Sequence, residues 1–572
     1  MNSPAHVERN RGWSGDLAAV TVCIFAGAVM SALPHLIEWW RTGHAVWIAD
    51  YDELDIYLPV ASHAWHGNPW HLADPVCPGR DSYLPWLFIN PAVILARLLG
   101  LPVIYIGFVR RLMAGAELGV VWYLIFRLYF SRRWIALSLA LFALFDLGTM
   151  DGRPLVEQVA EFVRLWRLPP DRLLSYPDSP MTSGPWRIIN PALSWPVLLI
   201  YIWTMARAVK SGSRAAAAWA AFGFGLCFSY FYYWTAVAGS LVIGAILDRT
   251  RRRAYLWTAG VGFLLGAPFI LRGLILKGQG TADWLQRFDQ FLPIGHFNEL
   301  MFPKVVIIAM VLALPWIFLR RGDLLYLWAL CVAALMVTNQ QILTGLQMEN
   351  KHWHYVWGPT AWLIVVLLIV DATMSSPRWS RRLLPLGIGL LLFTIASGLW
   401  IRSLETTRSE QSVMLTKTWD SFADQPRPAL RPGQVVAGMP ELVSMFTISD
   451  DERPLAGYLA RVSSCINDKE WNERIAADAY FSGLDREAFE SREKGRLAAD
   501  LWGRWGRNAA VRDAMLAERM ADYDQVAGDP DATAERFDIR YVVLPTGSEN
   551  NNLDRNWEQV VSGPVWLAWE RR

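Results

Sequence analysis

The chain has 572 residues, of which 53% are hydrophobic and only 19% are charged. A soluble protein of this length carries more charge, so the composition indicates an integral membrane protein. The formal net charge of +2 argues against a protein that binds nucleic acid through a broad basic surface. The five cysteines include no CxxC pair, and they give no zinc or redox motif.

The first apolar run covers residues 17–37 and follows Arg9 and Arg11. It is long enough to span a bilayer and exceeds the apolar core of a cleaved signal peptide, so we expect a signal anchor with a cytoplasmic N-terminus. Residues 38–83 then form a first external loop, in which tryptophans typical of a lipid–water interface flank an acidic cluster. The cluster is Asp50, Asp52, Glu53 and Asp55.

Carboxylates at this depth are partly desolvated, so their pKa values are suited to proton transfer or metal binding. A solvated acidic turn beside an aromatic belt is the structural alternative.

Residues 84–130 allow two arrangements. They hold either two spans broken near Arg110 and Arg111, or an interfacial helix over 84–99 followed by one span over 102–127. We prefer the second arrangement, because it leaves the basic residues that follow in the cytoplasm. It also places both arginines inside the bilayer, where charges are costly and usually paired or functional.

Nine further apolar runs predict spans, and the basic connectors between them fall on one side of the membrane. They cover residues 134–148, 191–208, 215–229, 231–247, 255–271, 305–319, 324–337, 355–370 and 383–401. We therefore predict a mostly α polytopic membrane protein with about eleven transmembrane helices in residues 1–401. An odd number of spans places the C-terminus outside.

From residue 402 onward, charged residues are frequent and the apolar runs shorten to strand length. Residues 485–525 carry helical periodicity with mixed charge. We therefore predict an external α/β domain over residues 402–572. Its expected strands cover residues 434–437, 540–545, 557–561 and 565–569, the last two forming a hairpin.

The first loop carries a motif made of Asp52, Glu53, Tyr57, Ala61, Gly67 and Trp70. The motif resembles the C-type glycosyltransferase (GT-C) superfamily, which includes protein O-mannosyltransferases, aminoarabinose transferases and oligosaccharyltransferases. Members carry an acidic pair early in this loop, often Asp-Glu followed shortly by Tyr, and Tyr57 lies one residue later than in the closest version. The order of spans, acidic loop, interfacial helix and external domain is similar too, and residues 537–544 resemble the tail domain of bacterial members.

The resemblance implies a membrane glycosyltransferase that moves a sugar from a polyprenyl-phosphate carrier to a glycan, lipid or protein acceptor. The reaction would occur at the external face, which in bacteria is the periplasmic face of the inner membrane. Inverting transfer needs a carboxylate to deprotonate the acceptor hydroxyl, and cations or a metal to hold the departing phosphate. We expect Asp52 to be the catalytic base and Glu53 to support it or bind metal, with Asp50 and Asp55 as alternatives. A requirement for Mg²⁺ or Mn²⁺ stays open.

Other polar residues are candidates for substrate binding. Arg110 and Arg111 suit a phosphate clamp, although arginines near a span end also extend to the interface. Asp151 lies in the second external loop beside Asp146, where a helix-capping turn is the alternative. The remaining candidates are Asp50, Tyr57, Gln347, Lys351, His352 and His354, the last four in a polar loop over 339–359 whose alternative is a hydrated connector.

Two other classes of function stay open. A polysaccharide polymerase or flippase for lipid-linked sugars needs cationic loops but no general base. A secondary transporter usually shows two related halves with broken helices, and no such pairing is visible. His63, His66 and His71 follow no known zinc-ligand spacing.

Three cysteines, Cys23, Cys227 and Cys331, fall within predicted spans, where they act as small apolar residues. Cys77 and Cys465 fall outside, in the first loop and the C-terminal domain. Two unpaired thiols are the favoured interpretation, because sequence does not show whether the Cα atoms come within bonding range. The alternative is a disulfide that ties the domain over the acidic loop.

Overall fold

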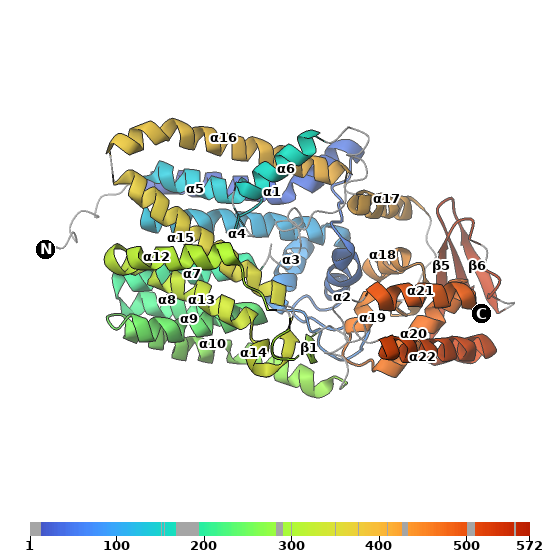
Figure 1. Ribbon diagram of the computed structural model, residues 1–572. Coiled ribbons are helices and arrows are strands. Elements are labelled where there is room, and N and C mark those ends of the chain that lie inside the picture. The colour runs from blue at the N-terminus through green and yellow to red at the C-terminus, as the bar shows by residue number, and fades with distance from the viewer. Residues whose placement is uncertain are drawn as a thin grey trace.

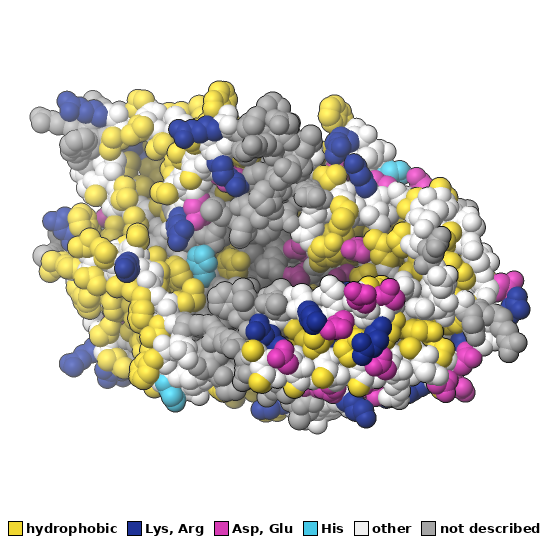
Figure 2. Space-filling model, turned by 45° about the vertical axis from the view of Figure 1, so that its right-hand side comes forward, with side chains coloured by type: hydrophobic (Ala, Val, Ile, Leu, Met, Phe, Trp, Pro, Cys, Tyr) yellow, Lys and Arg dark blue, Asp and Glu magenta, His cyan; other side chains and the backbone are white. Residues whose placement is uncertain are grey.

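The computed structural model describes residues 13–149, 152–153, 155–167, 194–281, 290–293, 295–298, 300–348, 350–375, 377–408, 410–425, 433–499, 509–548, 550–553 and 556–572. They form a helical domain and, at one end of its long helices, a C-terminal domain that carries a sheet (Figure 1). Figure 2 shows hydrophobic side chains spread over the helical domain and interspersed acidic and basic side chains on the C-terminal domain. This contrast is typical of a bundle embedded in lipid and a domain in water.

A helix occupies each of the eleven predicted spans. These helices are α1 (Trp13–Thr42), α4 (Ile106–Tyr129), α5 (Arg133–Phe145), α7 (Trp195–Ser211), α8 (Arg214–Cys227), α9 (Phe231–Leu247), α10 (Arg252–Gln279), α12 (Lys304–Arg320), α13 (Leu325–Thr338), α15 (His354–Met374) and α16 (Pro377–Arg408). The predicted fold class, a mostly α polytopic membrane protein, is confirmed. A helix satisfies its own backbone hydrogen bonds, as an apolar segment in lipid requires.

Six stretches of the described chain are long and apolar enough to cross a membrane. They are Gly15–Thr42, Val103–Tyr129, Arg252–Gln279, Gly322–Thr344, His354–Met374 and Arg382–Leu404. The region around the two arginines follows the preferred arrangement. A short apolar helix, α3 (Trp86–Leu98), precedes α4, which continues without a break through Arg110 and Arg111.

The second predicted loop contains a helix that the sequence analysis missed, α6 (Val156–Arg167). Its polar face points into the protein, where the Gln158 amide donates to the Thr394 carbonyl at 2.7 Å. Its apolar face is exposed at Val159 and Trp166. Helical periodicity alone does not identify this helix as part of a bundle, because three of its four buried residues, Glu157, Gln158 and Glu161, are polar.

Helices α1 and α4 touch through their backbones at small residues. A Cβ atom on Gly115 would lie 2.1 Å from the Gly27 carbonyl oxygen, and one on Gly119 would lie 2.0 Å from that of Cys23. Gly115 and Gly119 form a GxxxG pair, the spacing that allows membrane helices to approach closely. This contact holds α4 against the helix that leads into the acidic loop.

The C-terminal domain is built on a five-stranded sheet of order β4-β3-β5-β7-β6. Strands β4, β3 and β5 are parallel, and β5, β7 and β6 are antiparallel. The strands are β3 (Val435–Gly438), β4 (Arg453–Pro454), β5 (Ile539–Pro545), β6 (Trp557–Ser562) and β7 (Trp566–Arg571). The helices are α17 (Glu410–Asp424), α18 (Pro440–Asp450), α19 (Tyr458–Val462), α20 (Asp468–Phe481), α21 (Arg486–Ala499), α22 (Ala509–Gly528) and α23 (Pro530–Arg536). Each expected strand is present, including the terminal hairpin.

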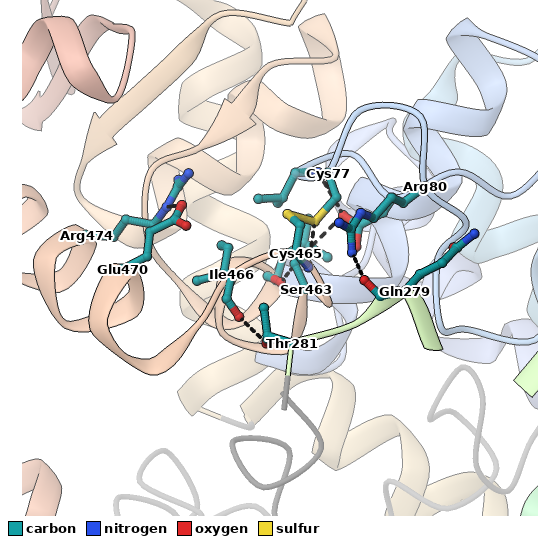
Figure 3. Close-up of a disulfide and its surroundings, with 12 residues drawn as sticks. Cys77, Arg80, Gln279, Thr281, Ser463, Cys465, Ile466, Glu470 and Arg474 are labelled. Carbon is teal, nitrogen blue, oxygen red and sulfur yellow. Dashed lines mark hydrogen bonds and ion pairs between the residues drawn. A yellow bond between two sulfur atoms is a disulfide. The ribbon is translucent and has the colours of Figure 1, made fainter. Parts of the chain in front are cut away.

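Cys77 and Cys465 form a disulfide, with Cα atoms 5.9 Å apart, so the favoured interpretation of two unpaired thiols is wrong (Figure 3). The chain folds back over 388 residues to bring them together, which no local pattern reveals. Thr281, just after α10, donates from its backbone to the Ser464 carbonyl at 2.9 Å and from its hydroxyl to the Ile466 carbonyl at 2.9 Å. The first loop, the end of α10 and the C-terminal domain therefore meet at one joint.

Candidate functional site

The acidic loop lies between the helical domain and helix α18 of the C-terminal domain. Helix α17 holds the backbone of the two residues that precede the acidic cluster. The Thr416 hydroxyl accepts from Ile48 N at 3.3 Å, and the Ser412 hydroxyl donates to the Ala49 carbonyl at 2.8 Å. Asp50 then accepts from Glu53 N at 2.8 Å through its side chain, which orders the start of the following helical turn. The predicted binding residue Asp50 thus supports the loop itself.

Glu53 is buried and forms a bidentate ion pair with Arg111 of α4. Its Oε1 accepts from Arg111 Nη1 at 2.9 Å and its Oε2 accepts from Nη2 at 2.6 Å, while Oε2 also accepts from Ala49 N at 2.8 Å. Gly107 leaves room for the carboxylate, because a Cβ atom there would lie 2.6 Å from Oε1. Glu53 therefore links the acidic loop to α4 through charge-assisted hydrogen bonds.

Arg111 makes further contacts that hold its guanidinium in place. His35 Nε2 lies 3.0 Å from Nη1, and the guanidinium carbon stands 4.8 Å from the centre of the Trp47 ring. Both of these partners come from α1 or the segment that follows it. The contacts of Arg111 are therefore those of a structural cation within the helical domain.

Asp52 and Tyr57 are related by a π-helical turn, η1 (Glu53–Tyr57), which leads into α2 (Leu58–His66). The Leu58 amide donates to the Glu53 carbonyl, five residues back, where an α-helix would bond four residues back. A π turn accommodates one extra residue, so positions five apart occupy the same face. Asp52 lies immediately before this turn, and Tyr57 is its last residue.

Arg110 is fully buried beside this cluster. None of its three guanidinium nitrogens has a hydrogen-bond partner among the described residues. Glu53 and Tyr57 lie within electrostatic range. A buried cation without hydrogen bonds is costly, so this position is suited to receive an anion.

Asp55 faces the C-terminal domain, where the Ser444 hydroxyl of α18 donates to it at 2.8 Å. Burial, opposed by the Ser444 hydrogen bond and aided by the charge of nearby Glu441, raises the pKa of Asp55 to about 7. Glu441 also accepts from the Tyr51 hydroxyl at 3.1 Å. Sequence reasoning missed Ser444 and Glu441, because nothing local to α18 indicates that it covers the loop.

The polar loop over 339–359 contains α14 (Gln341–Thr344), β2 (Leu346–Met348) and η6 (Asn350–Trp353). The His352 ring pairs with the Tyr230 hydroxyl at 2.5 Å and stacks on Tyr232 with ring centres 4.5 Å apart. His354 packs on Trp357 at 4.6 Å. Two of the predicted donors thus lie among aromatic rings.

The backbone of Gln347 lies on β2 and that of Lys351 on η6, while both side chains lie outside the described residues. Tyr230, the partner of His352, has its ring 6.3 Å from that of Phe88 on α3. Since α3 packs on α2, this loop and the acidic loop lie at the same end of the helical domain.

The second loop is held near the start of α15. Asp146 accepts from the Leu155 amide at 2.8 Å and from the Thr149 hydroxyl at 3.1 Å. These contacts are those of a residue that orders a turn. A Cβ atom on Gly152 would lie 2.4 Å from the Gly358 carbonyl oxygen, so the loop touches α15. The predicted binding residue Asp151 lies outside the described residues.

Within the described part of the chain, no group of three or more His, Cys, Asp or Glu side chains is arranged to hold a metal ion. Three of the first-loop histidines have other partners. His63 pairs with Asp451 at 2.7 Å, His66 contacts the Ser62 hydroxyl at 3.1 Å, and His71 pairs with Asp81 at 2.6 Å.

No family model matches the chain, and no curated protein matches it. Two solved structures are similar to it at low identity. One is the crystal structure of ArnT from Cupriavidus metallidurans bound to undecaprenyl phosphate, with 11% identity, a TM-score of 0.49 and coverage of 98% of both chains. The other is the Archaeoglobus fulgidus oligosaccharyltransferase in the apo form, with 11% identity, a TM-score of 0.37 and coverage of 94% of this chain and 70% of that one.

Proposed function

We propose that the protein is a membrane glycosyltransferase that takes a sugar from a polyprenyl-phosphate carrier. The acceptor, a glycan, lipid or protein, would be modified at the membrane face that carries the C-terminal domain, the external or periplasmic face. The observation that supports this most concerns Arg110, which lies buried beside the carboxylate cluster. Its guanidinium makes no hydrogen bond to the described residues. A phosphate group would supply the anion that this position lacks.

Asp52 is our choice for the general base, because it is the first acid of the Asp-Glu pair in the first-loop motif that resembles C-type glycosyltransferases. Glu53 is engaged with Arg111, Asp50 accepts from the backbone of Glu53, and Asp55 accepts from Ser444. The acceptor hydroxyl oxygen would attack the anomeric carbon of the sugar while Asp52 takes the hydroxyl proton. The bond from that carbon to the phosphate oxygen breaks, and its electron pair leaves with the lipid phosphate.

Arg110 would stabilise the negative charge that develops on the departing phosphate. Arg111, which the sequence analysis paired with it as a phosphate clamp, would instead hold Glu53 in place. Glu53 already accepts three hydrogen bonds, and no group of acidic side chains in the described part of the chain is arranged to hold a metal, so we assign no step to Mg²⁺ or Mn²⁺.

The test is complementation of a deletion strain, read by mass analysis of its surface glycans and lipids. We expect deletion to remove one sugar from a surface component, and the wild-type gene to restore it. Asp52→Asn should fail to restore it, because loss of a general base lowers the rate by about 10²–10⁴-fold. Asp81→Asn, which changes another acid of the same loop, is the matched control and should restore the sugar. Normal modification by Asp52→Asn would favour the flippase, polymerase or transporter alternatives.

A further inference from the structure

A cavity of about 350 Å³ lies in the C-terminal domain beside the first loop, and no residue of the acidic cluster lines it. Val76 of the first loop forms part of its wall, next to the disulfide-bonded Cys77. Figure 3 shows Glu470 and Arg474 on the C-terminal-domain side of that disulfide. The polar part of the lining is Arg453, Arg474, Arg536, Glu470 and Asp538.

Two of the arginines share one aromatic ring. The guanidinium carbon of Arg474 stands 5.2 Å from the centre of the Phe537 ring, and that of Arg536 stands 5.1 Å from the same centre. Arg474 is held further by Glu470, which accepts from Nε at 2.9 Å, and by the Leu455 carbonyl, which accepts from Nη1 at 3.1 Å. The side chains are therefore positioned before any ligand binds.

The hydrogen bonds of the three arginines leave donors unused. Arg536 donates from Nη2 to Glu473 at 2.5 Å, and Arg453 donates from Nε to the Gly433 carbonyl at 2.5 Å and from Nη2 to Asp538 at 3.3 Å. Each guanidinium has five N–H donors. At least one nitrogen of each, Nη2 of Arg474 among them, has no protein partner among the described residues.

The three cations also repel one another. Burial lowers the pKa of Arg474, Glu470 opposes this, and the charges of Arg453 and Arg536 lower it further. The Asp538 side chain is 75% exposed, so its ion pair with Arg453 is weak and easily exchanged. An anion placed between the arginines would relieve the repulsion and use the free donors.

We propose that this cavity, which we call the arginine pocket, binds an anionic group, a phosphate or a carboxylate, on a ligand of about monosaccharide size. The volume lies at the lower end of the range for small-molecule sites, about 300–1,000 Å³. Planar guanidinium groups match both anions through paired N–H···O bonds. The proposal concerns a second site and does not depend on the proposed sugar transfer.

The experiment uses the full chain in lipid nanodiscs, without a sugar donor. Inorganic phosphate, glucuronate and neutral glucose are titrated by calorimetry at constant ionic strength, with chloride as the reference anion. Arg536→Gln and Arg453→Gln remove pocket cations. Arg486→Gln is the matched control, because Arg486 is an exposed arginine of the same domain that pairs with Asp524 outside the pocket.

We expect saturable binding of phosphate or glucuronate to the wild type and to Arg486→Gln, and none of glucose. The affinity should fall at least about tenfold in each pocket variant, the cost of losing a charge-assisted hydrogen bond. Phosphate binding alone assigns a phosphate ligand, and glucuronate binding alone assigns a carboxylate. No saturable binding of either anion, or equal affinity in the pocket variants, overturns the proposal. If the anion binds at Arg110 and not in the arginine pocket, Arg110→Met will abolish its binding and the pocket variants will retain it.

Discussion

Two buried arginines, adjacent in the sequence, have opposite surroundings. Arg111 is paired with Glu53 through two hydrogen bonds, whereas Arg110 has no hydrogen bond to the residues that the structure describes. A buried pair is costly to break, because the remaining charge loses its compensation. An unpaired buried cation is costly as it stands, and it therefore indicates a ligand.

Arg110→Met tests this difference. The variant should lower the affinity for polyprenyl phosphate at least about tenfold, because a charge-assisted hydrogen bond to phosphate is lost. Without ligand, its apparent unfolding temperature should be equal to or above that of the wild type, since an uncompensated buried charge has been removed. Lipid binding by fluorescence and thermal unfolding in detergent measure the two effects. Arg97→Gln, at the exposed end of α3, is the control, and wild-type lipid affinity in Arg110→Met would contradict the assignment.

Asp55 makes the stability depend on pH. The unfolded chain loses this proton near pH 3.8 and the folded chain near pH 7, because burial raises the pKa. The folded state thus binds the proton more tightly, so the free energy of unfolding falls as the pH rises from about 4 to about 7. Asp55→Asn should reduce this slope and should gain stability relative to the wild type at pH 8. Thermal unfolding at pH 5 and pH 8 measures the change in stability with pH, with Asp81→Asn as the control. The same pH dependence in Asp55→Asn and in the wild type would show that Asp55 does not cause it.

At the scale of elements, the contact between α1 and α4 determines where the charged groups lie. The glycines let the two helices approach at backbone distance, and α4 then presents Arg110 and Arg111 beneath the loop that follows α1. The π turn η1 acts on the loop itself, because it accommodates one extra residue just before α2. Neither the glycine contact nor the π turn can be recognised from the composition or the hydropathy of the chain.

Gly119→Leu should disrupt the helix contact. A Cβ atom would lie 2.0 Å from the Cys23 carbonyl oxygen, a backbone atom that cannot move aside cheaply. We expect a loss of at least about 1–3 kcal/mol in stability, as for other overpacked interiors. Gly260→Leu is a matched control within α10, since a Cβ atom there meets nothing within 4 Å. Thermal unfolding of both variants in detergent measures the difference, and equal losses would contradict the close packing.

At the scale of the whole molecule, the C-terminal domain forms part of the candidate site. Helix α18 places Ser444 and Glu441 against the acidic loop, and the disulfide joins the same two regions. The domain therefore contributes to the burial that raises the pKa of Asp55. It also forms the arginine pocket together with Val76.

Cys77→Ser should loosen this joint. The disulfide closes a loop of 388 residues, and removal of such a crosslink typically costs roughly 2–5 kcal/mol of stability. We expect a lower apparent unfolding temperature and faster proteolysis between the domains. Reductant should bring the wild type to the same temperature and leave the variant unchanged. Mass spectrometry of non-reduced, alkylated peptides checks the bond directly, and alkylated Cys77 in the folded wild type would contradict it.

Local patterns were sufficient for much of the fold. Apolar runs of membrane length predicted the helices, and short β-rich runs such as 540–545 predicted the strands, because both signals reside in neighbouring residues. The acidic loop was also visible in the sequence as four carboxylates between interfacial tryptophans. By contrast, α6 was missed, since its buried face is polar and the usual hydrophobic signal is reversed.

The sequence by itself determined the class of the protein, the positions of its spans and the neighbourhood of its carboxylates, since each depends on the composition of contiguous segments. Only the tertiary structure decided which charges are paired. Glu53 and Arg111 are 58 residues apart, and Asp55 and Ser444 are 389 apart, so their contacts depend on how the helices and the C-terminal domain pack. The same packing made the Cys77–Cys465 disulfide and left Arg110 buried beside the acidic loop, because burial and distance are properties of the folded chain.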